Sequence, residues 1–144
     1  MTEEEKAIKM FNSGFNCSQA VVSAFAEKIN FDEKLSLKIS TGFGAGMGRL
    51  QETCGAVTGA FMALGIYNCN ILNDNAEIKK NTYKMVQNFN SKFKELNKTV
   101  ICRELLGVDL NTDEGQKIIK DQNLHGTVCE KCIKDAVKIV NSFI

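Results

Sequence analysis

Proline and tryptophan are absent from this chain of 144 residues, and histidine occurs once, as His125. The absence of proline removes the strongest helix breaker, so long helices are permitted throughout the sequence. A single histidine cannot supply two imidazole ligands within one chain, which excludes the mononuclear metallohydrolase sites of the two-histidine type. These absences favour a helical protein and direct attention to other metal-binding or reactive side chains.

Net charge and long apolar runs are also lacking. The formal net charge is +1 and the charged residues of both signs are interspersed, so there is no basic footprint for nucleic acid or anionic lipid. No run reaches about 18 apolar residues, and the first ten residues lack the basic start and apolar core of a secretion signal. We expect a cytoplasmic protein that binds neither nucleic acid nor membranes.

Length and patterning predict one domain over residues 1–144, an all-α compact multi-helix bundle. The apolar content of 44% and charged content of 24% are near globular averages, and strand-like alternation is lacking. Capping boxes at residues 2–5, 16–19 and 127–130 predict three helix starts. Further helices are expected at about 32–40, with Leu35 and Ile39 as its apolar side chains, from an Asn75 cap to about 96, at 102–107 and within 112–120.

An unusually apolar segment at about 51–67 carries Gly55, Gly59 and Ala63 at four-residue spacing. Small residues at this spacing let another backbone approach closely, although each glycine costs about 1 kcal/mol of helix propensity relative to alanine. We interpret the segment as a buried helix at the centre of the bundle. The same small-residue face would equally suit a homodimer.

A string of glycines at every second position precedes that helix: Gly42, Gly44, Gly46 and Gly48. It fits neither the spacing of a dinucleotide fingerprint nor that of a P-loop, which disfavours a phosphate cradle. Exposed amides from Gly44, Gly46 and Gly48, the helix N-terminus and Arg49 would still favour an anion such as a thiolate or an anionic metal cluster. The alternative is that the glycines only form a tight irregular turn.

Six cysteines in a cytoplasmic chain point to metal binding or redox chemistry. Cys17, Cys54, Cys102 and Cys129 each lie near the predicted start of a helix, where the helix dipole and free amides lower the pKa of a thiol. The pattern predicts four reactive or ligating thiolates. The alternative interpretation is that they are small buried hydrophobic residues.

The remaining candidates carry weaker signals. Cys129 and Cys132 form a CxxC pair, but the βαβ setting of a thioredoxin is missing and there is no second close pair of the kind found in zinc fingers. A structural zinc site is therefore less favoured. Cys69 has no helix-start context, and we expect a surface role for His125.

Four segments carry a family resemblance: GFNCSQAV at 14–21, GFGAGMGRLQETCGAVTGA at 42–60, CRELLG at 102–107 and CEKCIKDAV at 129–137. Together they resemble the C_GCAxxG_C_C family of redox-active proteins over most of the chain. The resemblance implies that the four family cysteines fall on Cys17, Cys54, Cys102 and Cys129, leaving Cys69 and Cys132 outside the set. It also implies that Arg49, Gln51 and Glu52 surround Cys54.

Our leading hypothesis is a small redox protein in which these four cysteines converge. They either hold an iron–sulfur cluster for electron transfer, which we favour slightly, or cycle between dithiol and disulfide with Cys54 as the attacking thiolate. Either version requires a redox partner protein, which the sequence does not identify. Two alternatives stay open: a binding or structural module in which the cysteines hold zinc or only pack, and an enzyme with the glycine loop as its anion site.

Overall fold

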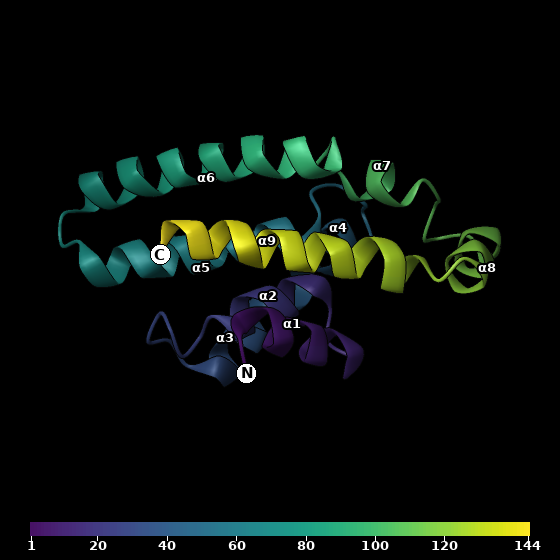
Figure 1. The fold of residues 1–144 in the computed structure, drawn as a ribbon, viewed down its shortest axis with the longest axis horizontal. Coiled ribbons are helices and arrows are strands. Elements are labelled where there is room, and N and C mark those ends of the chain that lie inside the picture. Colours follow the sequence, from purple (N-terminus) through teal and green to yellow (C-terminus); the bar gives the residue numbers. More distant parts are fainter.

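Helices account for nearly all the regular structure of this chain, as a computed structural model covering residues 1–144 shows (Figure 1). The helical elements are α1 (Glu3–Asn12), α2 (Cys17–Ala24), α3 (Glu33–Ser40), η1 (Thr41–Phe43), α4 (Gly44–Met47), α5 (Gly55–Ile71), α6 (Asn75–Asn97), α7 (Cys102–Leu106), α8 (Asp113–Asp121), η2 (His125–Cys129) and α9 (Glu130–Phe143). The only β-type pairing is an isolated bridge between Thr53 and Ile101. The predicted all-α bundle is confirmed.

Side-chain caps fix most helix starts where the sequence predicts them. Thr2 and Asn16 form complete capping boxes at α1 and α2, and Thr112 caps α8. The cap of α6 is Asp74, one residue before the predicted position. Gly107, with φ 71°, ends α7 in the left-handed conformation that glycine adopts without strain.

The apolar helix α5 begins at Gly55, four residues later than predicted, and packs against α2, α6 and α9. The close approach expected of its small residues is present on the α2 side. A Cβ atom at position 59 would lie 2.6 Å from the Ser18 carbonyl oxygen, so only glycine permits this spacing. The glycines of α5 therefore bring the N-terminal turns of α2 and α5 together.

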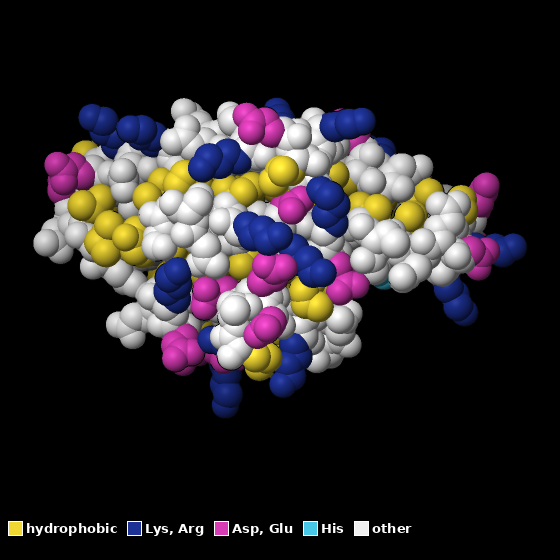
Figure 2. All heavy atoms as spheres, in the orientation of Figure 1, with side chains coloured by type: hydrophobic (Ala, Val, Ile, Leu, Met, Phe, Trp, Pro, Cys, Tyr) yellow, Lys and Arg dark blue, Asp and Glu magenta, His cyan; other side chains and the backbone are white.

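The core lies where α2, α5, α6 and α9 meet. Phe25, Phe89, Phe93, Leu64 and Ile133 are among its largest fully buried side chains. In Figure 1, α1 to α3 lie on one side of α9 and α6 on the other, while α7 and α8 extend one end of the bundle. Charges of both signs are interspersed on the face in Figure 2, and none of the helices combines the length and the apolar composition that a membrane span requires.

Two local predictions are wrong. The capping box at 127–130 does not form, because a π-helical turn, η2, runs directly into α9 and the Thr127 hydroxyl donates to the Asn123 carbonyl instead. In α3, Leu35 and Ile39 are exposed, whereas Ser36 and Ser40 are buried. The two serines face inward without cost because each hydroxyl donates to a backbone carbonyl of the same helix.

Candidate metal or redox centre

Two distant segments are hydrogen-bonded to each other immediately beside two of the predicted cysteines. The Cys54 amide donates to the Val100 carbonyl at 2.7 Å, and the Cys102 amide donates to the Glu52 carbonyl at 2.6 Å. These bonds join the loop before α5 to the loop before α7. Cys54 and Cys102 therefore lie side by side at the starts of two helices, although 48 positions separate them in sequence.

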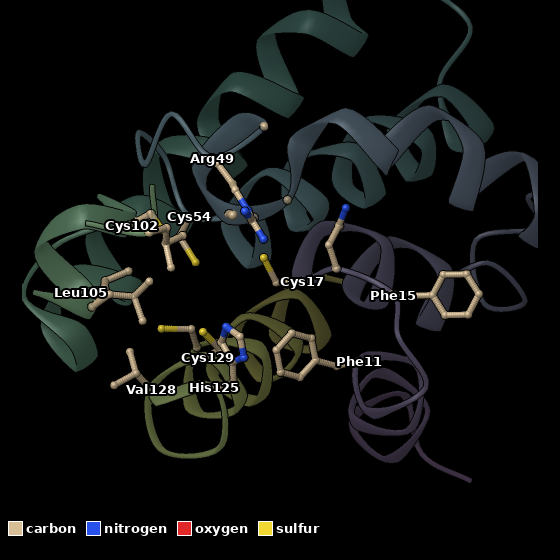
Figure 3. A pocket seen from close by; sticks show the side chains of 18 of the residues that line it. Phe11, Phe15, Cys17, Arg49, Cys54, Cys102, Leu105, His125, Val128 and Cys129 are labelled. Carbon is tan, nitrogen blue, oxygen red and sulfur yellow. The ribbon is translucent and has the colours of Figure 1, made fainter. Parts of the chain in front are cut away.

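All four predicted cysteines line one cavity of about 630 Å³. Cys17 comes from α2, Cys54 from the N-cap of α5, Cys102 from α7 and Cys129 from η2 (Figure 3). Cys54 and Cys102 are buried, while Cys17 and Cys129 are partly buried. Apolar side chains such as Phe11, Leu105 and Val128 flank the cysteines in the cavity wall.

The glycine string forms a left-handed turn at the rim of this cavity. Residues 45–49 all have positive φ angles between 55° and 69°, and the Gly48 amide donates to the Gly44 carbonyl at 2.9 Å. Left-handed backbone costs about 1–2 kcal/mol for each non-glycine residue, here Ala45, Met47 and Arg49. Gly46 and Gly48 relieve the strain at the two positions between them, and local strain of this kind concentrates at functional sites.

Glycine is also required by close contacts within the turn. A Cβ atom at position 46 would lie 2.6 Å from the Gln51 Cα and 2.8 Å from the Cys102 Cβ. A Cβ atom at position 44 would overlap the Asn16 side chain. The predicted cofactor-binding residues Gly44, Gly48 and Arg49 line the cavity, whereas Gly46 lies behind it against Cys102.

Nearby backbone amides affect the pKa of two of the thiols. Hydrogen bonds from the Ala45 and Ser18 amides act on the Cys17 sulfur, and those from the Ala56 and Val57 amides act on the Cys54 sulfur; all four lower the pKa of the thiol they contact. The donors are the left-handed turn and the first turns of α2 and α5. The predicted supply of amide donors from the glycine loop is therefore present at Cys17.

The net pKa shifts nevertheless contradict the predicted lowering. Burial and the neighbouring Cys54 raise the pKa of Cys17 to about 11, and burial with Cys54 and Cys17 raises that of Cys102 to about 12. The pKa of Cys54 is raised by its contact with the Cys132 thiol and by burial, and that of Cys129 by burial and the other three cysteines. Desolvation and the repulsion that neighbouring thiolates would exert on one another thus outweigh the helix dipoles.

The buried side chain of Gln51 connects two loops beside the cavity. Its side chain is fully buried, donates to the Val108 carbonyl at 2.8 Å and accepts from the Leu110 amide at 2.8 Å. It also hydrogen-bonds to the Cys102 sulfur, which favours the thiolate form. The side chain therefore fixes the loop after α7 to the loop before α5. No local pattern in the sequence indicates this role, because both partners lie more than 50 positions away.

The structure also places the three weaker site candidates from the sequence, Cys132, His125 and Cys69. Cys132 is 2% exposed and lines the same cavity as the other four cysteines. It falls outside the four-cysteine set predicted from the sequence, although its CxxC spacing from Cys129 could have indicated this position. His125 lines the cavity with an exposed ring set edge-on against Phe11. Cys69 is exposed and lies outside this cavity.

The cavity wall carries a positive side chain and no negative one. Arg49 is exposed, points into the cavity in Figure 3 and has no acidic partner, since the two ion pairs of the chain are Lys6–Glu27 and Lys131–Asp135. None of the residues lining the cavity is an aspartate or a glutamate. No three His, Cys, Asp or Glu side chains are arranged so that they could hold a single metal ion.

Comparison with known proteins agrees with the resemblance seen in the sequence. Residues 15–143 match the family described as "Putative redox-active protein (C_GCAxxG_C_C)". A protein of Archaeoglobus fulgidus named "Uncharacterized protein" is 28% identical over 116 residues, which cover 73% of this chain and 77% of the archaeal one. No solved structure matches.

Proposed function

Because the chain belongs to the C_GCAxxG_C_C family of redox-active proteins, we propose that it is an electron-transfer protein whose Cys17, Cys54, Cys102 and Cys129 bind an iron–sulfur cluster. The observation that carries the proposal is the wall of one cavity, which combines these four cysteines with Arg49 and contains no carboxylate. Four cysteine thiolates are the usual ligand set of such a cluster.

The donors and charges around the four sulfurs support the proposal of an anionic cluster. Hydrogen bonds from the Ala45 and Ser18 amides act on the Cys17 sulfur and those from the Ala56 and Val57 amides on the Cys54 sulfur, and all of them favour the thiolate form. Gly44 and Gly48 keep the rim of the cavity clear of side chains, and Arg49 supplies the only full positive charge in its lining. A bound cluster would supply reversible electron uptake, while these residues hold the ligands and balance their charge.

The raised pKa values count against thiol cycling. An attacking thiolate works best when its pKa is near the ambient pH, and the pKa of Cys54 is raised well above that range. Positive iron bound to the sulfurs would remove the mutual repulsion that keeps the thiols protonated, because metal binding displaces thiol protons. We therefore propose the cluster as the leading function and the dithiol–disulfide centre as the alternative.

Anaerobic purification tests this proposal. We expect a coloured protein that contains iron and acid-labile sulfide in similar amounts and loses its visible absorption on chelation or reduction. One zinc ion per chain would instead support the structural metal site. A colourless, metal-free protein that retains full stability after replacement of all four cysteines by serine would show that the thiols only pack.

A further inference from the structure

The cavity that contains the four cysteines extends past them to an opening on the protein surface. Cys54 and Cys102 are buried, whereas Arg49 and His125, which line the same cavity, are exposed. The cavity volume of about 630 Å³ lies within the roughly 300–1,000 Å³ that small-molecule pockets occupy. The proposed cluster needs the part that the cysteines line, and it leaves the outer part without a ligand.

The side chain of Arg49 is an unpartnered cation in this outer part. It takes part in neither ion pair of the chain, and the hydrogen bonds that Arg49 makes within the chain involve its backbone alone. The side chain points into the cavity (Figure 3), whose lining contains no aspartate or glutamate. A guanidinium presents N–H donors in a planar fork that matches the two oxygens of a carboxylate, so the group that would pair with Arg49 is missing from the chain itself.

The backbone of Arg49 is fixed in a conformation that disfavours any side chain. Its φ angle is 64°, in the left-handed region that glycine adopts freely and other residues adopt with strain. The Asn111 side-chain amide donates to the Arg49 carbonyl at 3.0 Å and so holds the base of the side chain in place. A glycine would suit this position better for folding, and strain of this kind beside a cavity points to a use for the side chain.

The wall on the other side of the cavity is mainly apolar. Phe11 and His125 are set edge-on with their ring centroids 6.1 Å apart, and Val128 lies in the same lining. In Figure 3 these side chains enter the cavity from the side that faces Arg49. An apolar wall across from a guanidinium suits an organic acid, because the carboxylate can pair with the arginine while the body of the molecule packs against the rings.

We propose that the outer part of this cavity is a binding site for a small organic carboxylate, in which Arg49 pairs with the carboxylate group and Phe11 packs against the apolar body. The inference goes beyond the proposed function, because such binding requires no cluster. In a protein that holds the cluster, the bound molecule would lie towards the opening from Cys17 and Cys129, which are only partly buried. That is the position of a small-molecule substrate between the proposed centre and the solvent.

Titration calorimetry with benzoate as the probe tests this site on the full chain, purified anaerobically. Benzamide is the neutral probe of the same shape, and inorganic phosphate is the anion without an apolar body. Arg49→Gln removes the charge, and Arg49→Gly also removes the backbone strain, so the thermal stability of the glycine variant should equal or exceed that of the wild type. Lys84→Gln is the matched control, because Lys84 is exposed and lies outside the cavity.

We expect saturable benzoate binding by the wild type and the control, and roughly ten- to hundredfold weaker binding by both Arg49 variants, the range for loss of a charged hydrogen-bonding partner. Benzamide and phosphate should bind more weakly than benzoate. Three results overturn the inference: no benzoate binding by the wild type, wild-type affinity in Arg49→Gln, or binding of benzamide or phosphate as tight as that of benzoate. Should Arg49→Gly fail to fold, Arg49→Gln carries the same test.

The iron content of the same preparations tests the proposed function separately. Iron without benzoate binding refutes this inference alone, whereas Arg49-dependent benzoate binding by a protein that takes up no iron refutes the cluster alone. The two failures are therefore distinguishable.

Discussion

Gly55 lies directly against the sulfur atom of Cys17. A Cβ atom at position 55 would overlap the Cys17 Sγ and lie 3.1 Å from the Ser18 amide nitrogen. The absence of a side chain at this position allows the N-termini of α5 and α2 to meet, so that Cys54 and Cys17 open into the same cavity.

Substitution of Gly55 by alanine should therefore damage the site. The added methyl group displaces the Cys17 sulfur and crowds α2, so we expect a loss of about 1–3 kcal/mol in the free energy of unfolding and a lower iron content. Gly65→Ala in the same helix is the control, because a Cβ there meets nothing within 4 Å and should stabilise the helix by up to about 1 kcal/mol. Equal stability and equal iron content in the two variants would contradict the assigned role of Gly55.

The left-handed turn gives a second prediction. Gly46→Ala places a Cβ at a residue with φ 69° and against backbone atoms of Gln51 and Glu52 at 2.6 and 2.7 Å. These atoms cannot move independently of the loop, so we expect a destabilisation of about 2–4 kcal/mol in chemical denaturation. Gly42→Ala, whose Cβ meets nothing within 4 Å, should change stability by no more than about 0.5 kcal/mol. A harmless substitution at position 46 would show that the turn is not fixed as described.

Local signals predicted most of the helices, because capping residues such as Thr2, Asn16 and Thr112 act over only three positions. The prediction failed where distant partners decide the structure. Residues 51–54 stay outside α5 because they pair with the segment around Ile101 and because the Gln51 side chain bonds to residues 108 and 110. Thr127 does not cap a helix because the preceding turn continues into α9.

Local sequence signals likewise predicted part of the site but not the features that depend on distant partners. The spacing of cysteines at helix starts and the family resemblance selected the four thiols that line the cavity, and their roles stay a proposal. The predicted lowering of their pKa values failed because a linear sequence shows each helix dipole but not the burial and mutual proximity of the thiols. Cys132 of α9 and Cys54 at the start of α5 line the same cavity, a proximity that no pattern within either segment could reveal.

Gln51 offers a test of how the cavity is supported. Gln51→Ala leaves the Val108 carbonyl and the Leu110 amide without their partner in a buried position, so we expect a loss of about 2–4 kcal/mol in the free energy of unfolding. Glu52→Ala changes the neighbouring exposed side chain and should alter stability by no more than about 0.5 kcal/mol. Indistinguishable unfolding curves for the two variants would mean that the Gln51 hydrogen bonds do not hold the loops together.

Alkaline pH should destabilise the metal-free protein. The pKa of Cys17 is raised from an ordinary value of 9.0 to about 11 in the folded state, so above pH 9.0 the unfolded chain binds fewer protons than the native one. The stabilisation is fully present below pH 9.0 and is lost as the pH rises to about 11, with about 3 kcal/mol attributable to this thiol at 1.36 kcal/mol per pKa unit. Denaturant unfolding under reducing, anaerobic conditions measures it.

Cys17→Ser provides the control for that pH dependence, because serine does not titrate in this range. Its stability should fall less steeply between pH 9.0 and about 11 than that of the wild type. Parallel pH profiles for the two proteins would show that Cys17 is not the group whose ionisation opposes folding.

The most direct measurement of the central claim is the iron and acid-labile sulfide content of single cysteine-to-serine variants, purified anaerobically in parallel. If Cys17, Cys54, Cys102 and Cys129 hold one cluster, replacement of any one of the four should sharply reduce both contents and the visible absorption, whereas Cys69→Ser should match the wild type. Wild-type contents in all four variants, or a wild-type protein without iron and sulfide, would contradict the account.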